Sequence, residues 1–170
     1  MANGVAETRG RIRSRPGAAW VVAALASIVA VDQLTKSWAA TALADGPKHV
    51  IGDFLVLELS RNSGGAFSRF QGYAPVLAVL AIVIALIIVR SLRQATDRST
   101  LVGLVLVLGG ALGNLSDRLV RSPGFLRGHV VDFVAVGWWP VFNFADSCIT
   151  IGAILLIVRT LLAPATAPSS

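Results

Sequence analysis

Two aspartates in the C-terminal part of the chain have the residue type and the setting for acid–base chemistry. Asp132 and Asp146 lie at the edge of the last hydrophobic stretch, in the run VVDFVAVGWWPVFNFADSCITIGAILLIV. Two carboxyl groups that share one environment do not both ionise easily, so one can act as an acid and the other as a base. Such a pair can activate water to cut a peptide bond. Asp132 alone would be an ordinary loop aspartate, so its role depends on proximity to Asp146.

The composition indicates that these carboxyl groups belong to a membrane protein. Of the 170 residues, 55% are hydrophobic and 14% are charged, and the mean hydropathy is +0.72, which is too apolar for a soluble domain. An ionisable residue among membrane helices is costly and is therefore a candidate for function. The net charge of +6 comes from arginines at segment ends and in short loops, which does not favour nucleic-acid binding. With one cysteine, Cys148, the chain has neither a disulfide framework nor a Cys-rich metal site.

Four apolar segments predict four transmembrane helices. They cover residues 17–31, 75–89, 101–115 and 142–158, the last interrupted by Asp146. Each is shorter than the roughly 20 residues that cross the hydrocarbon, so each helix must include flanking polar residues. Gly109 and Gly113 have the spacing that allows close contact between helices. We predict an all-α polytopic membrane protein with one domain, 17–162, between a basic tail, 1–16, and a disordered tail, 163–170.

The direction of the helices predicts where their polar residues meet. The first and third helices run the same way and the fourth runs the opposite way. The C-terminal ends of the first and third therefore lie on the same side as the N-terminal end of the fourth. The side chains expected to converge there, together with two on connecting loops, are Asp32, Lys36, Asn62, Asn114, Asp117, Arg118, Asp132, Asn143 and Asp146.

Basic residues predict the orientation in the membrane. Four arginines precede the first helix, at positions 9, 11, 13 and 15, and three more lie between positions 90 and 98. Cytoplasmic loops are enriched in such residues, so both termini are expected in the cytoplasm and the polar site near the outer face. A cleavable signal peptide ending near Ala42 is the alternative. Charged Asp32 and Lys36 interrupt it, and three more hydrophobic segments follow, so a retained helix is favoured.

The segment between the first two helices predicts a small β structure. Residues 49–70 mix β-branched and aromatic residues with partial alternation before a Ser/Gly turn. We expect a hairpin or cradle at the outer membrane interface, within about 45–72. Phe67 and Phe70 near its end are candidates for contact with acyl chains or for anchoring among lipid headgroups.

Several polar residues also have local structural interpretations. Asp32 and Lys36 are four residues apart and can form an ion pair within one helix, and Lys36 could instead snorkel to the interface. Asn143 could cap the fourth helix. For the remaining pair, Asp117 and Arg118, an interfacial ion pair that fixes the third helix is favoured over direct chemistry.

Other functional classes fit the residues less well. The two histidines, His49 and His129, lack the HExxH spacing of a zinc protease, and no GxSxG motif is present. The Asp/Asn cluster could also hold a hard cation, and this possibility stays open. A small proton- or cation-coupled membrane carrier is the main alternative to an enzyme. It would need ionisable groups along the crossing path, whereas the cytoplasmic halves of the helices have almost none.

The polar residues lie in sequence blocks that resemble one known family. The blocks are VDQLTKSWA, RNSGGAF, GGALGNLSDRL, and VVDF followed by FNFADSCITIG, and they cover about residues 31 to 152. In this order they are similar to the blocks of lipoprotein signal peptidase, also called signal peptidase II. Each block is weak alone, whereas four in order are specific.

This resemblance implies an aspartyl endopeptidase of the bacterial cell membrane. Its substrates would be prolipoproteins that carry diacylglycerol on a cysteine, and it would cleave just before that cysteine without a metal or organic cofactor. Asp132 and Asp146 match the catalytic dyad, and the seven other converging residues match those that line and brace the site. Prolipoproteins and membrane lipid are the expected partners, nucleic acid is not, and we expect a monomer.

Overall fold

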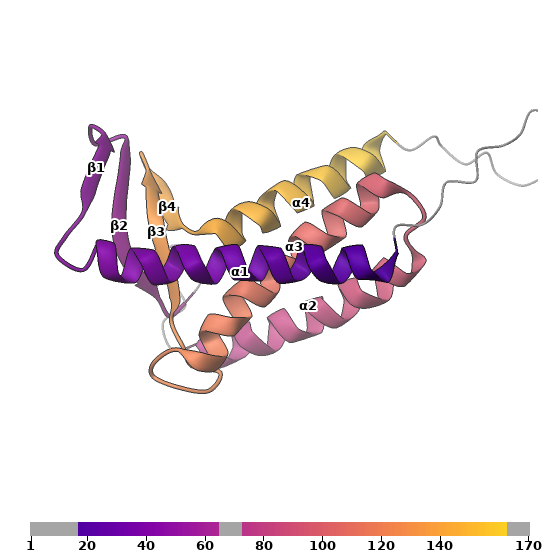
Figure 1. Ribbon diagram of the computed structural model, residues 1–170, viewed down its shortest axis with the longest axis horizontal. Coiled ribbons are helices and arrows are strands. Elements are labelled where there is room, and N and C mark those ends of the chain that lie inside the picture. The colour runs from indigo at the N-terminus through magenta and orange to yellow at the C-terminus, as the bar shows by residue number, and fades with distance from the viewer. Residues whose placement is uncertain (1–16, 65–72, 163–170) are drawn as a thin grey trace, which may run out of the picture.

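The structure is a computed structural model that describes residues 17–64 and 73–162. Four helices lie side by side and a sheet closes one end of the bundle (Figure 1). In chain order the elements are α1 (Ala18–Ala42), β1 (Lys48–Ile51), β2 (Leu55–Asn62), α2 (Ala74–Gln94), α3 (Arg98–Val120), β3 (Val130–Val136), β4 (Trp139–Phe142) and α4 (Phe144–Leu161). The predictions for both tails, for the arginines before residue 17 and for Phe67 and Phe70 fall outside the described residues.

The four predicted membrane helices are confirmed, and they extend past their apolar segments as expected. The helices contain 25, 21, 23 and 18 residues and are long and apolar enough to cross a membrane. α1 therefore carries Asp32 and Lys36 within its regular part, and α3 carries Asn114 and Asp117. These residues lie in the C-terminal halves of α1 and α3, and these helix ends point toward the sheet (Figure 1).

Helix α3 is the central element, and glycine lets its neighbours approach closely. A Cβ at Gly109 would meet the side chain of Ile28 on α1 at 2.8 Å, and one at Gly113 would meet Asp32 Oδ2 at 2.6 Å. These contacts confirm the predicted close approach at Gly109 and Gly113. On the other side, a Cβ at Gly110 would overlap the backbone oxygen of Ala145 on α4.

The sheet is larger than the sequence predicted. Its four strands are antiparallel in the order β1-β2-β3-β4, so the predicted hairpin within 45–72 is only half of it. The expectation that Asn62 and Asp132 occupy loops is wrong, because Asn62 ends β2 and Asp132 lies in β3. Strands β3 and β4 were missed because they are short and their residues are mostly apolar on both faces, without alternation. A short apolar run of this kind does not distinguish strand from helix.

The sheet is held against the bundle by apolar contacts with the end of α1. Ala39, Leu43 and Phe133 form a buried cluster, and the rings of Trp38 and Phe133 meet edge to face with centroids 6.2 Å apart. Pairing of β2 with β3 brings Ser60 opposite Asp132. Asp132 is thereby fixed on a buried strand next to the helix ends.

Candidate active site

All nine predicted residues lie where the helices meet the sheet. Helix α1 supplies Asp32 and Lys36, and strands β2 and β3 supply Asn62 and Asp132. The rest lie on α3 or at the start of α4, namely Asn114, Asp117, Arg118, Asn143 and Asp146. Eight of the nine are joined in one network of hydrogen bonds and ion pairs, and Arg118 lines the adjoining cavity.

Asp132 and Asp146 face one cavity of about 430 Å³. Asp132 accepts hydrogen bonds from Asn143 Nδ2 at 2.6 Å and from Asn62 Nδ2 at 2.9 Å. Asp146 accepts from Asn114 Nδ2 at 2.8 Å and from the backbone N–H of Asn143 at 3.2 Å. Asn143 therefore contacts both carboxylates and ties β3 to the start of α4.

Asn143 also caps α4, as predicted. Its Oδ1 accepts from the backbone N–H of Asp146 at 2.9 Å, and the carboxylate of Asp146 accepts from the backbone N–H of Asn143. This reciprocal capping box satisfies two backbone donors that a helix start otherwise leaves free. Because Oδ1 is an acceptor in this cap, the amide nitrogen of Asn143 points toward Asp132.

Lys36 is the fully buried centre of the network. Its ammonium group pairs with Asp32 at 2.8 Å and with Asp117 at 2.9 Å, and it donates to Asn114 Oδ1 at 2.9 Å. Three hydrogen bonds use all three ammonium protons. The predicted pair with Asp32 is confirmed, and the snorkelling alternative is wrong because two carboxylates compensate the charge inside the protein. The bond from Lys36 also fixes the Asn114 amide, whose nitrogen must then face Asp146.

Asp117 pairs with other cations than the predicted one. It binds Lys36 and Arg121 Nε, the latter at 2.7 Å, and it accepts from the backbone N–H of Val131 at 3.2 Å. The expected pair between Asp117 and Arg118 is wrong because consecutive helical residues point in different directions, whereas residues four apart share a face. The bond to Val131 anchors β3 at the residue before Asp132.

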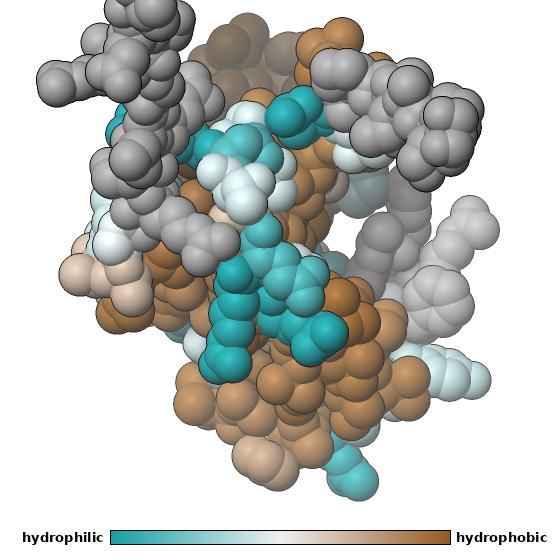
Figure 2. All heavy atoms as spheres, turned by 90° about the vertical axis from the view of Figure 1, so that its right-hand side faces the viewer, coloured by the Kyte–Doolittle hydropathy of each residue, from teal (hydrophilic) through white to brown (hydrophobic). Residues whose placement is uncertain are grey.

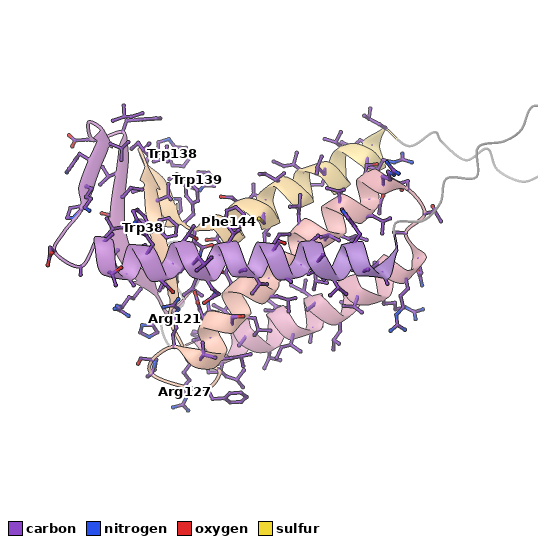
Figure 3. The ribbon with its side chains drawn as sticks, viewed as in Figure 1. Trp38, Arg121, Arg127, Trp138, Trp139 and Phe144 are labelled. Carbon is purple, nitrogen blue, oxygen red and sulfur yellow. The ribbon has the colours of Figure 1, made fainter. Side chains whose placement is uncertain are left out.

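Gln33 and Arg121 are parts of the network that sequence reasoning missed. Gln33 Nε2 lies within hydrogen-bond distance of Asp117 Oδ1 at 3.0 Å, the Gly113 carbonyl at 3.1 Å and Asp32 Oδ2 at 3.2 Å. Arg121 Nη2 donates to Gln33 Oε1 at 3.4 Å. The spacing of Asp117 and Arg121 could have indicated this ion pair, whereas no spacing rule connects Gln33 to α3. Figure 3 shows Arg121 at the sheet end of α3.

Arg118 is a buried cation whose donors are not all used. Its side chain lines the cavity with Asp132 and Asp146, and the residue is 7% exposed. Within residues 17–64 and 73–162, its buried Nη1 has no hydrogen-bond partner. Such an atom is rare in a folded protein and calls for an explanation. Here the donor belongs to a residue that lines the same cavity as the two carboxylates.

The electrostatic setting of Asp132 favours its protonated form. Burial raises the pKa of Asp132 to about 6, the hydrogen bond from Asn62 opposes this rise, and the charge of Asp146 adds to it. Asp132 therefore changes its charge close to neutral pH. In the part of the chain that the structure describes, no group of three or more His, Cys, Asp or Glu side chains is arranged to hold a metal ion.

The brace on Asp117 generates a stability prediction. Replacing Arg121 by glutamine (Arg121→Gln) removes a charged donor from a fully buried carboxylate. The free energy of unfolding should fall by about 1–3 kcal/mol, because hydrogen bonds to charged groups contribute this much. Thermal unfolding of the purified protein in detergent measures the change. The matched control Arg127→Gln, on an exposed loop arginine, should leave Tm unchanged, and equal Tm values for both variants would contradict the brace.

Comparison with known proteins identifies the family. A family model described as signal peptidase (SPase) II matches residues 24–162. The lipoprotein signal peptidase of Rhodococcus jostii (strain RHA1) is 51% identical over 136 residues, which are 79% of this chain and 69% of the relative. That of Mycobacterium avium (strain 104) is 48% identical over 80% of this chain and 75% of its own.

Solved structures agree with this match. A bacterial membrane enzyme determined by the in meso method at 2.3 Å resolution has a TM-score of 0.78 and 28% identity, over 90% of this chain and 94% of its own. A second such enzyme, at 1.9 Å resolution, has a TM-score of 0.73 and 32% identity, over 86% of this chain and 95% of its own. None of these matches supports the carrier alternative, and the resemblance in the sequence blocks is confirmed. The chain belongs to the signal peptidase II family and is a bacterial membrane peptidase.

Proposed function

We propose that the chain is an aspartic endopeptidase that removes the signal peptide from diacylglyceryl-modified prolipoproteins, cleaving just before the lipidated cysteine. The name of its relatives, lipoprotein signal peptidase, supports the substrate class. The observation that carries the mechanism is that Asp132 and Asp146 line one cavity and are both held by Asn143.

In the proposed reaction, the two carboxyl groups share one proton and a water molecule lies between them. The ionised carboxylate takes a proton from the water, whose oxygen attacks the scissile carbonyl carbon. The protonated carboxyl group donates its proton to the carbonyl oxygen, which becomes a hydroxyl in the tetrahedral intermediate. Collapse of this intermediate breaks the C–N bond and passes a proton to the leaving amine. The shared titration belongs to the pair, so the two roles are not divided between Asp132 and Asp146.

The neighbouring amides would hold the two carboxyl groups in fixed positions relative to each other. Asn143 restrains Asp132, and Asn114 restrains Asp146, each through a directed N–H bond. The Lys36 ammonium fixes the Asn114 amide from behind. Lys36 therefore acts as a positioning residue in the proposed mechanism, because its ammonium group bonds to Asp32, Asp117 and Asn114 and to neither of the two cavity carboxylates.

Arg118 is the proposed substrate donor. Its buried Nη1 has no partner among the described residues and belongs to a side chain that lines the cavity. A peptide carbonyl of the bound precursor would satisfy this donor without adding charge. The guanidinium would also offset negative charge that develops on the oxygens near Asp132 and Asp146.

A second hollow provides a place for the lipid. It has a volume of about 310 Å³ and shares four residues with the larger cavity, namely Trp139, Phe142, Asp146 and Thr150. It adds Ser147 and Ile151 of α4, and Ile151 is 53% exposed. An acyl chain of the substrate would lie there, where burial contributes about 0.8 kcal/mol per CH₂ group. Lipid would thereby supply much of the affinity for the precursor.

The cleavage reaction tests the proposed dyad. Turnover of a diacylated precursor peptide should fall by about 10²- to 10⁴-fold in Asp132→Asn and in Asp146→Asn, because each change removes one acid–base group. An otherwise identical precursor with an unmodified cysteine should be cut far more slowly by the wild-type protein. Arg127→Gln, remote from the cavity, is the matched control. Near-wild-type turnover in either aspartate variant would remove that residue from the mechanism, and equal cleavage of both precursors would exclude selection by lipid.

The pH profile tests the environment of Asp132. Asn62→Ala removes a hydrogen bond that favours the ionised carboxylate, so the pKa of Asp132 should rise above its value of about 6. The alkaline limb of kcat/KM, where the pair loses its last proton, should move to higher pH by roughly 0.5 to 1 unit. The control is Arg61→Ala, on the neighbouring exposed residue of the same strand. An unmoved alkaline limb in Asn62→Ala would show that this carboxyl group does not set the profile.

We also propose that both termini lie in the cytoplasm and that the sheet end lies at the outer face, which the arginines at positions 90, 93 and 98 support. A cysteine introduced by Ser122→Cys should react with a membrane-impermeant reagent in intact cells, and one introduced by Gln94→Cys should not. Both positions are exposed, and the native Cys148 is buried, so its background reaction should be low. The reverse labelling pattern would place the cavity on the wrong side for an exported substrate.

A further inference from the structure

A long apolar groove lies at the end of the bundle opposite the sheet. Helices α1 and α2 both pack against α3, and the space between them is about 480 Å³, within the range of about 300–1,000 Å³ typical of ligand pockets. Its lining is apolar except for one arginine. The lining residues are Ala18, Val21, Val22, Leu25, Val89, Leu92, Arg93, Ala95, Leu101 and Leu108.

The groove is bordered by side chains that face the membrane. Val22 is 65% exposed and lines it from α1, and Val89 is 39% exposed and lines it from α2. Both helices are long and apolar enough to span the bilayer. A groove with such walls is best filled by hydrocarbon, because water there would find almost no hydrogen-bonding partners.

Positive charge gathers at the mouth of the groove. Arg93 lines both the groove and a neighbouring hollow that also contains Arg90. Arg98 lines a third hollow, and this one shares Leu101 with the groove. Figure 2 shows hydrophilic residues crossing this end of the molecule with hydrophobic residues beside them.

These arginines have no carboxylate partner within the described ranges. Arg90, Arg93 and Arg98 form no ion pair or side-chain hydrogen bond with residues 17–64 or 73–162. The acidic residue at this end, Asp97, is already bonded by Ser99 and Thr100 and lies 3.4 Å from Arg159 Nε. All three arginines are exposed, so the charge at the mouth is accessible to an anion from outside these segments.

We propose that this groove is a binding site for an anionic phospholipid. One acyl chain lies between α1 and α2 on the surface of α3, and the lipid phosphate is bound by Arg93, with Arg90 and Arg98 beside it. Free phosphate would leave the apolar walls unfilled, and an uncharged lipid would leave the arginines unpaired. The site is at the other end of the bundle from Asp132 and Asp146, so it does not depend on the proposed cleavage reaction.

Native mass spectrometry of the full-length protein in detergent tests the headgroup. Phosphatidylglycerol and phosphatidylcholine with the same acyl chains are titrated, and phosphatidylglycerol should bind more tightly. Arg93→Gln should weaken phosphatidylglycerol binding by roughly fivefold, the factor that corresponds to the loss of one basic residue near an anionic lipid. It should weaken phosphatidylcholine binding less, because the choline cation already offsets the phosphate charge of that lipid. Arg127→Gln, exposed at the sheet end, is the charge-matched control. Equal binding of the two lipids, or equal effects of both substitutions, would overturn the proposal.

A second variant tests the acyl chain. Val22→Trp fills the groove from its exposed rim and should weaken binding of both lipids, whereas Val31→Trp places the same side chain elsewhere on α1 and should not. Unchanged Tm shows that the variants are folded. If only Arg93→Gln weakens binding, the headgroup binds at the surface and the groove is not the site. Displacement of bound lipid by millimolar inorganic phosphate would likewise refute an acyl-chain site.

Discussion

The buried ammonium group of Lys36 is the interaction on which the rest of the site depends. A cation in the interior costs several kcal/mol unless carboxylates and hydrogen bonds compensate it, and removing one partner leaves another charge unpaired. Asp32 on α1 and Asp117 on α3 provide this compensation at 2.8 and 2.9 Å. The ends of the two helices must therefore meet in one register. Gly113 makes this register possible, because a larger residue would collide with Asp32.

The same ammonium group determines how two amides are turned. Asn114 Oδ1 accepts from Lys36 and from Asn143, so the Asn114 nitrogen is left to donate to Asp146. Asn143 Oδ1 is an acceptor in the helix cap, so the Asn143 nitrogen donates to Asp132 and Asn114. The buried ammonium group thus orients the two asparagine amides, and these amides in turn orient the two carboxylates. Such a chain can keep acid and base in place without a rigid metal centre.

The location of the site could be predicted from the sequence more accurately than the strands and contacts that hold its residues in place. Helix direction alone placed Lys36, Asn114 and Asp146 at one end, because that inference needs only four spanning segments. The strand around Asp132 was missed, since an apolar run has no period that separates a buried strand from a helix. The contacts of Gln33 and the ion pair between Lys36 and Asp117 depend on how α1 and α3 are rotated against each other. That rotation follows from tertiary packing, which no spacing within one helix reveals.

The arrangement of charges gives a physical reason for the shared proton of the proposed mechanism. Lys36 and Arg121 compensate Asp32 and Asp117, so this part of the network is neutral as a unit. Arg118 is then the remaining cation beside Asp132 and Asp146. With both of these carboxylates ionised, the cavity would carry one uncompensated negative charge beside the buried Asp132, which is unfavourable. One bound proton removes that charge, and it also creates the acid and base pair that peptide hydrolysis requires.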